Sequence, residues 1–274
     1  MLQSYPKIFS HLILISGILL MIVPIWMIFA SSTHSNSTIS SEGMQIFIGE
    51  NFFENYDKVL NIRGGFYKEI TASSMLINSF IMAIGIASLT VVISLMSAFA
   101  IVYFKFKLAV PFFWLIFITI LVPLELRIMP SYQVVSDLGL TNSYAGLILP
   151  LSASAIATFF FRQFYLSIPN ELLEAAKLDG ANSWKFFIDF LIPLSKTMIM
   201  AVFIFMFVYG YNQYLWPLIM TTSEKYWTVV MGMKMLNIRS SVEGYAYIIL
   251  SMLPPVLVII ILQRYFIQGL FQSK

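Results

Sequence analysis

The stretch that decides the fold reads SIPNELLEAAKLDGANSWKFF and occupies residues 167–187. It is polar and amphipathic, whereas the chain on both sides of it is strongly apolar. Pro169 suits the first turn of a helix, Glu171 suits the positive end of the helix dipole, and Gly180 can end a helix by taking a left-handed conformation. We therefore expect a short surface helix here, followed by a second short helix within residues 183–193.

Apolar runs make up most of the remaining chain. Hydrophobic residues are 59% of the 274 residues and charged residues are 11%, whereas soluble domains are about half apolar and a quarter charged. About 20 helical residues cross a hydrocarbon layer of roughly 30 Å, and the runs lack the alternation of a membrane barrel. We predict an all-α polytopic membrane protein with six transmembrane helices, at residues 11–31, 75–102, 108–128, 143–162, 197–220 and 244–263.

The basic residues indicate which way the chain enters the membrane. An even number of spans places both termini on one side, and cytoplasmic termini put nine of the sixteen Lys and Arg residues inside, Lys105, Lys107 and Lys274 among them. The first loop on the opposite side, residues 32–74, is mostly acidic. We therefore predict cytoplasmic termini. A signal peptide is the alternative for the first run, but that run is longer than a usual signal core.

Several kinds of chemistry have no residues to carry them. The chain contains no cysteine, and His11 and His34 have neither a partnered acid nor metal-ligand spacing. No phosphate-binding Gly-Lys-Ser/Thr loop occurs, and the net charge of +3 comes from scattered residues, which argues against nucleic acid as a partner. We expect no catalytic residue, metal or cofactor. An intramembrane enzyme and a stand-alone channel or carrier are alternatives from other classes.

A spaced motif lies within the polar stretch. Glu174-Ala175-Ala176 is followed at fixed distances by Gly180 and Pro193. From residue types alone, the simplest interpretation is an interfacial helix that returns the chain to the membrane. The spacing, however, resembles the pattern E-A-A-x3-G-x9-I-x-L-P of permeases in ATP-binding-cassette importers.

Two positions depart from that pattern, because Phe190 stands in place of Ile and Ile192 in place of Leu; both replacements are apolar. The sequence Asp179-Gly180-Ala181 resembles the sugar-uptake (maltose-type) branch of the family. The resemblance implies that this loop is a coupling helix docked on an ATP-hydrolysing subunit.

The resemblance also implies a set of partners. The working unit would contain a second permease subunit, two ATP-binding subunits that hold ATP and Mg²⁺, and an external solute-binding protein. This chain would then be a non-catalytic transport subunit in the bacterial inner membrane. Its regions would be a first helix with an external loop (1–74), a permease core (75–265) whose coupling loop covers about 164–195, and a short cytoplasmic tail (266–274).

Further stretches are similar to the permease subunits of sn-glycerol-3-phosphate importers. The similarity implies transport of that phosphate ester or of glycerophosphodiesters, with a neutral sugar or oligosaccharide as the alternative solute. The stretches are residues 123–130, 134–139, 144–147, 159–164 and 209–217.

Four polar residues are candidates for the translocation pathway. Glu125 and Arg127 end the third predicted span, where Arg127 could meet a phosphate through its planar fork of donors. The pair could instead only hold the helix end at the membrane surface. Asn212 and Gln213 lie in the fifth predicted span, where amides either line a pathway or bond neighbouring helices. We expect Trp216 to be an interface anchor.

Overall fold

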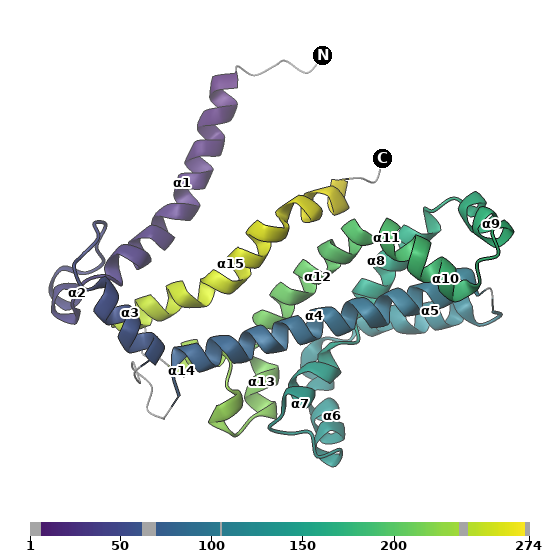
Figure 1. Ribbon diagram of the computed structural model, residues 1–274. Helices are drawn as coiled ribbons and strands as arrows, with labels where there is room; N and C mark the ends of the chain where they lie inside the picture. The colour runs from purple at the N-terminus through teal and green to yellow at the C-terminus, as the bar shows by residue number, and fades with distance from the viewer. Residues whose placement is uncertain (1–6, 62–69, 105, 236–240, 272–274) are drawn as a thin grey trace. The chain divides into compact units, whose positions relative to one another are not determined.

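The computed structural model describes residues 7–61, 70–104, 106–235 and 241–271, and within these ranges the chain is helical and has no strand (Figure 1). The prediction of an all-α protein is confirmed. Lys105 and Lys274, two of the basic residues assigned to the inner side, lie outside the described residues.

The helices differ widely in length. The α-helices are α1 (Lys7–Ser31), α2 (Asn36–Glu42), α3 (Phe52–Asn61), α4 (Ala72–Tyr103), α5 (Ala109–Ile118), α6 (Leu124–Asp137), α7 (Tyr144–Ile148), α8 (Ala155–Leu166), α9 (Asn170–Leu178), α10 (Ser183–Phe186), α11 (Ile192–Leu194), α12 (Lys196–Tyr211), α13 (Leu215–Met220), α14 (Val229–Met235) and α15 (Val242–Phe271). Short 3-10 segments are η1 (Thr119–Leu121), η2 (Leu149–Leu151) and η4 (Glu224–Tyr226), and η3 (Phe187–Leu191) is a π-helix.

Three helices are long and apolar enough to cross a membrane unbroken, at Phe9–Ser31, Ala72–Tyr103 and Val242–Tyr265. They match the first, second and sixth predicted spans. The other three apolar runs are bent pairs of helices, so among the described residues the chain has six spans only if each pair crosses once. The six crossings and the cytoplasmic termini stay predictions.

Two of the bent pairs correct spans that we predicted as one helix, at 108–128 and 143–162. The third pair joins the predicted second short helix to the start of the fifth span, and that span, predicted at 197–220, is instead broken after Tyr211. The pairs are Ala109–Leu121 with Glu125–Asp137, Tyr144–Leu151 with Ala155–Leu166, and Ser183–Leu194 with Lys196–Tyr211. The second pair bends by 48° and the third by 73°.

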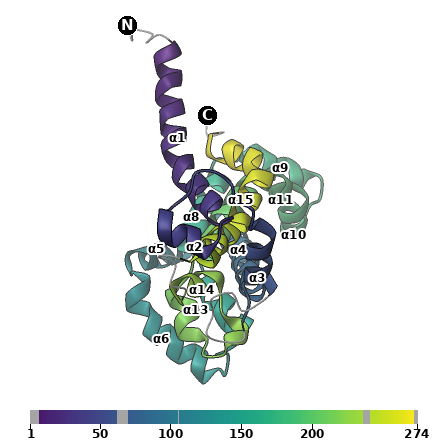
Figure 2. The same cartoon turned by 90° about the vertical axis from the view of Figure 1, so that its left-hand side faces the viewer.

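The break in the third run follows from Pro123. Val122, which precedes this proline, is extended at φ −88° and ψ 108°, because the proline ring disfavours helical backbone at the preceding residue. Pro123 is extended as well and becomes the N-cap of α6. Figures 1 and 2 show that α6 runs in a different direction from α5.

The chain divides into two compact units. Residues up to 76 together with 231–253 form unit 1, and residues 77–230 together with those from 254 onward form unit 2. These units are sets of mutual backbone contacts. The predicted regions 1–74, 75–265 and 266–274 stay predictions.

Within unit 2, small residues let α4 pack closely against its neighbours. A Cβ at Gly210 of α12 would lie 3.1 Å from Cδ1 of Ile86, and one at Gly85 would lie 2.6 Å from Cδ1 of Ile148. Side chains larger than hydrogen would force these helices apart, which is why membrane helix interfaces favour small residues.

Buried hydroxyl groups add bonds along the same helix. The hydroxyl of Thr90 donates to the carbonyl of Ser152 at 3.0 Å, and the hydroxyl of Thr158 donates to that of Ser94 at 3.3 Å. These bonds tie the middle of α4 to η2 and α8, since polar groups in an apolar bundle find partners on neighbouring helices.

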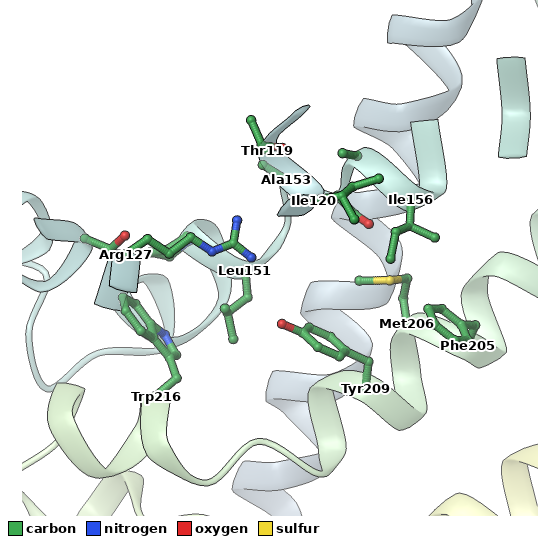
Figure 3. A pocket seen from close by; sticks show the side chains of 14 residues that line it. Thr119, Ile120, Arg127, Leu151, Ala153, Ile156, Phe205, Met206, Tyr209 and Trp216 are labelled. Atoms are coloured by element: carbon green, nitrogen blue, oxygen red, sulfur yellow. The ribbon is translucent and has the colours of Figure 1, made fainter. Parts of the chain in front are cut away.

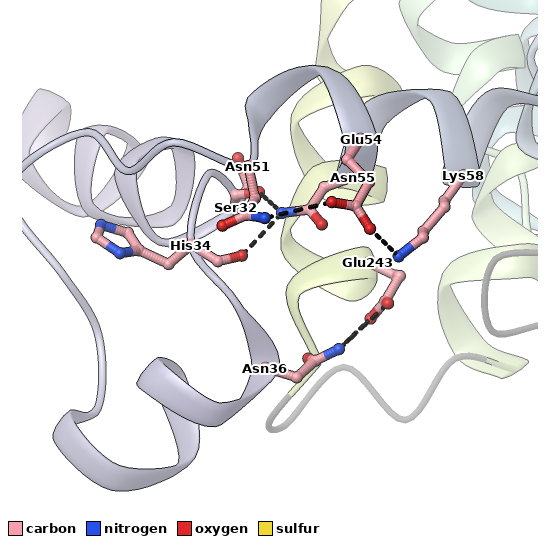
Figure 4. Close-up of polar contacts among 8 residues, drawn as sticks. All are labelled: Ser32, His34, Asn36, Asn51, Glu54, Asn55, Lys58 and Glu243. Carbon is pink, nitrogen blue, oxygen red and sulfur yellow. Dashed lines mark hydrogen bonds and ion pairs between the residues drawn. The ribbon is translucent and has the colours of Figure 1, made fainter.

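Unit 1 contains helices where we predicted an external loop at residues 32–74. The side-chain amide of Asn36, the first residue of α2, donates to both carboxylate oxygens of Glu243 in α15 at 3.2 and 3.1 Å, and its oxygen accepts from the backbone N–H of Val242 at 2.9 Å (Figure 4). Lys58 of α3 forms an ion pair with Glu54 at 2.6 Å, and this hydrogen bond lowers the pKa of Glu54.

Candidate functional site

The coupling-loop candidates lie on two short helices beside the C-terminal end of α4 (Figure 1). Helix α9 covers Asn170–Leu178 with Pro169 as its N-cap, and α10 starts at Ser183, as predicted from the sequence. Asn182 caps α10, because its side-chain oxygen accepts the backbone N–H of Lys185 at 2.8 Å.

Gly180 ends α9 in the left-handed conformation, with φ +77°. The backbone N–H of Ala181 donates to the carbonyl of Ala176 at 2.9 Å, and that of Gly180 donates to Lys177 at 3.0 Å. Nested bonds of this kind satisfy the last carbonyls of a helix and require a residue that tolerates positive φ. Nothing lies within 4 Å of a Cβ built at Gly180, so the backbone angle, and not space, restricts this position inside the chain.

The outer face of α9 is open. Glu174, Ala175 and Asp179 are exposed, and neither carboxylate has a hydrogen-bond partner among the described residues. Leu178 is 90% exposed, which is unusual for a leucine outside the apolar spans. Ala176, in contrast, is 1% exposed because it lies on the inner side of the helix. The exposed face combines two unpaired acids with an apolar side chain.

Aromatic rings fasten α10 and η3 to α4. The ring of Phe186 lies 5.4 Å from that of Tyr103, and the ring of Phe187 lies 4.8 Å from that of Phe99. Both phenylalanines are buried. Sequence reasoning did not select these residues, although two adjacent phenylalanines in an otherwise polar stretch were the available signal. They make α10 and the end of α4 one packed body.

The chain turns into α12 directly after this region. Pro193 is exposed within α11, and Ser195 is buried at the bend, where its hydroxyl donates to the carbonyl of Leu191 at 2.6 Å. Phe190 and Ile192, the two departures from the motif, are half-buried.

A cavity of about 380 Å³ lies where the bent spans meet in unit 2 (Figure 3). Its walls come from α6, α8, α12 and α13 and from the short segments before α6 and α8. The lining residues are Thr119, Ile120, Arg127, Ser131, Pro150, Leu151, Ala153, Ser154, Ala155, Ile156, Phe205, Met206, Tyr209 and Trp216.

Arg127 is the one charged residue among those that line the cavity. Figure 3 shows its guanidinium group and the hydroxyl of Tyr209 pointing into the same space. Trp216 lies beside them and is 1% exposed, with its ring N–H donating to the carbonyl of Gly146 at 3.2 Å. Our expectation of an interface anchor at Trp216 was wrong, because the indole group is bonded inside the helix bundle. The cavity offers one cation, hydroxyl groups and aromatic walls.

The other three pathway candidates do not line this cavity. Glu125 is exposed in the first turn of α6, and no ion pair joins it to Arg127. Asn212 is exposed and forms the C-cap of α12, and the side-chain amide of Gln213 donates to the carbonyl of Tyr209 at 3.2 Å. The two amides thus lie in the break after α12, and not inside a continuous fifth span.

The described residues contain no group of three His, Cys, Asp or Glu side chains that could hold a metal ion. The ring of His34 bonds to the carbonyl of Phe47 at 3.0 Å in the segment between α1 and α3.

Comparison with known proteins identifies the family. Residues 91–272 match the family model described as binding-protein-dependent transport system inner membrane component. The chain is 44% identical over 283 residues to the sn-glycerol-3-phosphate transport system permease protein UgpE of Rhizobium meliloti (strain 1021), with 100% of both chains covered. It is 41% identical over 272 residues to the protein of the same name from Yersinia pestis bv. Antiqua (strain Antiqua), covering 97% of this chain and 96% of that one.

A solved structure has the same fold. A chain in the crystal structure of a bacterial ABC transporter involved in the import of the acidic polysaccharide alginate superimposes with a TM-score of 0.81 at 21% identity, covering 95% of this chain and 96% of that chain. The chain therefore belongs to the family of binding-protein-dependent transport system inner membrane components, the permease subunits of ATP-binding-cassette importers.

Proposed function

We propose that this chain is the permease subunit of a bacterial inner-membrane importer that carries sn-glycerol 3-phosphate or glycerophosphodiesters into the cytoplasm. The observation that carries the proposal is the end-to-end similarity to permease proteins named for sn-glycerol 3-phosphate, at 44% and 41% identity. A second permease subunit, an ATPase dimer that binds ATP and Mg²⁺, and an external binding protein complete the working unit.

In this proposal α9 is the element that the ATPase subunit binds. Glu174 and Asp179 have no hydrogen-bond partners among the described residues, and Leu178 is almost fully exposed. An ATPase subunit can therefore form hydrogen bonds with the two carboxylates and bury the leucine side chain. Gly180 sets where the helix ends, and Ala175 leaves room for close approach. Ala181 and Pro193 then direct the chain back toward α12.

Arg127 is the residue that we assign to the phosphate group. A guanidinium group offers a planar fork of N–H donors to phosphate oxygens, and this one points into a cavity that contains no acid. Tyr209 and Trp216 supply aromatic walls beside the guanidinium group. Glu125, Asn212 and Gln213 remain pathway predictions that the cavity does not support.

The experiment is ATP hydrolysis by the reconstituted importer, containing both permease subunits, the ATPase and the binding protein. Hydrolysis is measured with sn-glycerol 3-phosphate or with a neutral sugar, for the unchanged chain and for Arg127→Gln and Arg127→Lys. Leu126→Gln is the matched control, because Leu126 is exposed on the same turn of α6 and does not line the cavity.

We expect stimulation by sn-glycerol 3-phosphate, its loss in Arg127→Gln, partial retention in Arg127→Lys and no change in Leu126→Gln. Stimulation by a neutral sugar alone would overturn the phosphate-ester assignment and keep the importer. Equal stimulation of Arg127→Gln and the unchanged chain would remove Arg127 from the pathway. Transport without any ATPase partner would favour a stand-alone carrier.

A further inference from the structure

Residues 45–49, called here the apolar loop, join α2 to the segment before α3 and carry three outward-facing apolar side chains. Ile46 is 58% exposed, Phe47 is 82% exposed and Ile48 is 57% exposed. Three adjacent large apolar side chains that are this exposed form an apolar patch, which is uncommon on a loop that faces water.

The backbone of the apolar loop, in contrast, is bonded to the end of α1. The backbone N–H of Gln45 donates to the hydroxyl of Ser31 at 2.8 Å, and that of Gly49 donates to the hydroxyl of Thr33 at 2.6 Å. The indole N–H of Trp26 donates to the carbonyl of Ile46 at 2.8 Å.

A fourth bond comes from His34, whose ring N–H donates to the carbonyl of Phe47 at 3.0 Å. The apolar loop therefore turns its polar backbone toward α1 and its side chains away from it. Each of these four bonds pairs one backbone group of the loop with α1 or with the residues just after it, and so lowers the cost of bringing the loop next to lipid, where an unbonded peptide group is costly.

The same bonds fix the loop at a definite depth. Trp26 lies five residues before Ser31, the last residue of the apolar span, which corresponds to about 7.5 Å along a helix axis. Tryptophan in this position belongs to the belt of aromatic residues at the membrane surface. A carbonyl bonded to this indole lies at the same level, between the hydrocarbon layer and the headgroups.

The apolar loop is also held rigidly. The side-chain amide of Asn55 in α3 donates to the carbonyls of Ser32 and His34 at 2.9 and 2.8 Å (Figure 4). These bonds hold the segment after α1, to which the loop is hydrogen-bonded. A Cβ at Gly49 would lie 2.7 Å from the backbone oxygen of Thr33, so the loop fits closely only with glycine there.

We propose that the apolar loop inserts into the lipid leaflet in which α1 ends, and anchors the external part of unit 1 to the membrane surface. The occupant is lipid and not a soluble protein, because the loop is tied to a span whose most apolar 18-residue stretch is unburied within the described chain, and the loop continues that apolar surface. Glu42 and Glu50 flank the apolar loop and are exposed, so the charged edges stay in water while the tip enters the acyl boundary.

The test uses single cysteines, which this chain allows because it has none of its own. Phe47→Cys and Ile48→Cys are labelled with an environment-sensitive nitrobenzoxadiazole dye. They are assembled with partner subunits that lack reactive cysteines and reconstituted in phosphatidylethanolamine and phosphatidylglycerol vesicles, with or without brominated phosphatidylcholine. Glu50→Cys is the matched control, since it is exposed in the same segment but lies at the polar edge.

We expect blue-shifted emission at residues 47 and 48, a loss of that emission with brominated lipid, and neither effect at residue 50. Emission typical of water at both loop positions would overturn the proposal. So would a blue shift that brominated lipid does not quench, because another protein would then cover the loop. Retained ATP hydrolysis of each labelled importer shows that the variant is folded.

Discussion

Replacement of Gly180 separates two explanations of why α9, the proposed coupling helix, ends in glycine. At φ +77° an ordinary side chain costs about 1–2 kcal/mol, whereas asparagine tolerates this region. Since about 1.4 kcal/mol is a factor of ten, Gly180→Ala should reduce the population of the native cap relative to open ends roughly 5- to 30-fold. No atom of this chain would contact the new Cβ, so strain is the whole effect within the chain.

The assay is solute-stimulated ATP hydrolysis by the reconstituted importer, with membrane insertion of each variant checked in parallel. We expect Gly180→Ala to lower stimulation, Gly180→Asn to retain more of it than alanine does, and Gly180→Leu to abolish it because leucine adds bulk to strain.

Normal solute-stimulated ATP hydrolysis with an inserted Gly180→Leu variant would refute the reasoning altogether. A Gly180→Asn variant that is worse than Gly180→Ala would refute the part that rests on backbone strain. It would instead indicate that a partner surface approaches the glycine closely.

Three substitutions in unit 2 test its packing, each by thermal unfolding of the purified chain in detergent. Asn78→Ala should destabilise by about 3 kcal/mol, because the side chain forms three hydrogen bonds, with two carbonyls and the hydroxyl of Tyr144, each of which contributes about 1 kcal/mol; an unchanged midpoint would contradict this. Gly210→Leu should cost about 1–3 kcal/mol by overpacking against Ile86, and an equal or raised midpoint would exclude that contact. Trp216→Phe keeps a ring but loses the indole bond, so we expect a loss of about 1 kcal/mol, and a larger loss would show that ring shape matters more than the bond.

The features that could be predicted from the sequence are those set by near neighbours along the chain. Pro169 and Gly180 mark the limits of α9 because caps depend on a few adjacent residues. The first, second and sixth spans are predictable for a similar reason, since uninterrupted apolarity over 20 or more residues identifies a membrane helix.

The bent spans show why apolarity alone is not enough. Pro123 was a readable signal for the first break. The sequence carried no such signal for the π-helix η3 (Phe187–Leu191), which depends on how these residues pack against α4. Trp216 was misjudged because its partner, Gly146, is 70 residues away in the chain.

The segment that follows α1, which contains α2 and α3, was the least predictable part. Its residues are polar and contain Ser, Asn and Gly, so a loop was the natural expectation. The bonds that order it run between Asn36 and Glu243 and between Asn55 and Ser32, and no local pattern indicates them. The structure of this segment is hard to predict because its hydrogen-bonded partners lie far apart in the sequence, and not because of its residue types.

In unit 2, α4 connects the coupling region to the segment at residues 225–229. At one end, Asn78 donates to the carbonyls of Lys225 and Trp227 at 2.8 and 2.9 Å. At the other end, Phe99 packs on Phe187 with ring centres 4.8 Å apart. Twenty-one residues separate Asn78 from Phe99, which is about 31 Å of helix and comparable to the hydrocarbon thickness of a bilayer.

This connection is stiff at both ends. The aromatic contact is buried, and the amide bonds are reinforced by Ser79, whose hydroxyl accepts the backbone N–H of Val229 at 2.8 Å. A push on α10 therefore moves α4 before it deforms either contact, because packed interiors shift as bodies more readily than they compress. Since the helix between the contacts is continuous, the displacement reaches residues 225–229 with little loss. One continuous helix thus joins the packing contact of η3 to the bonds at residues 225–229.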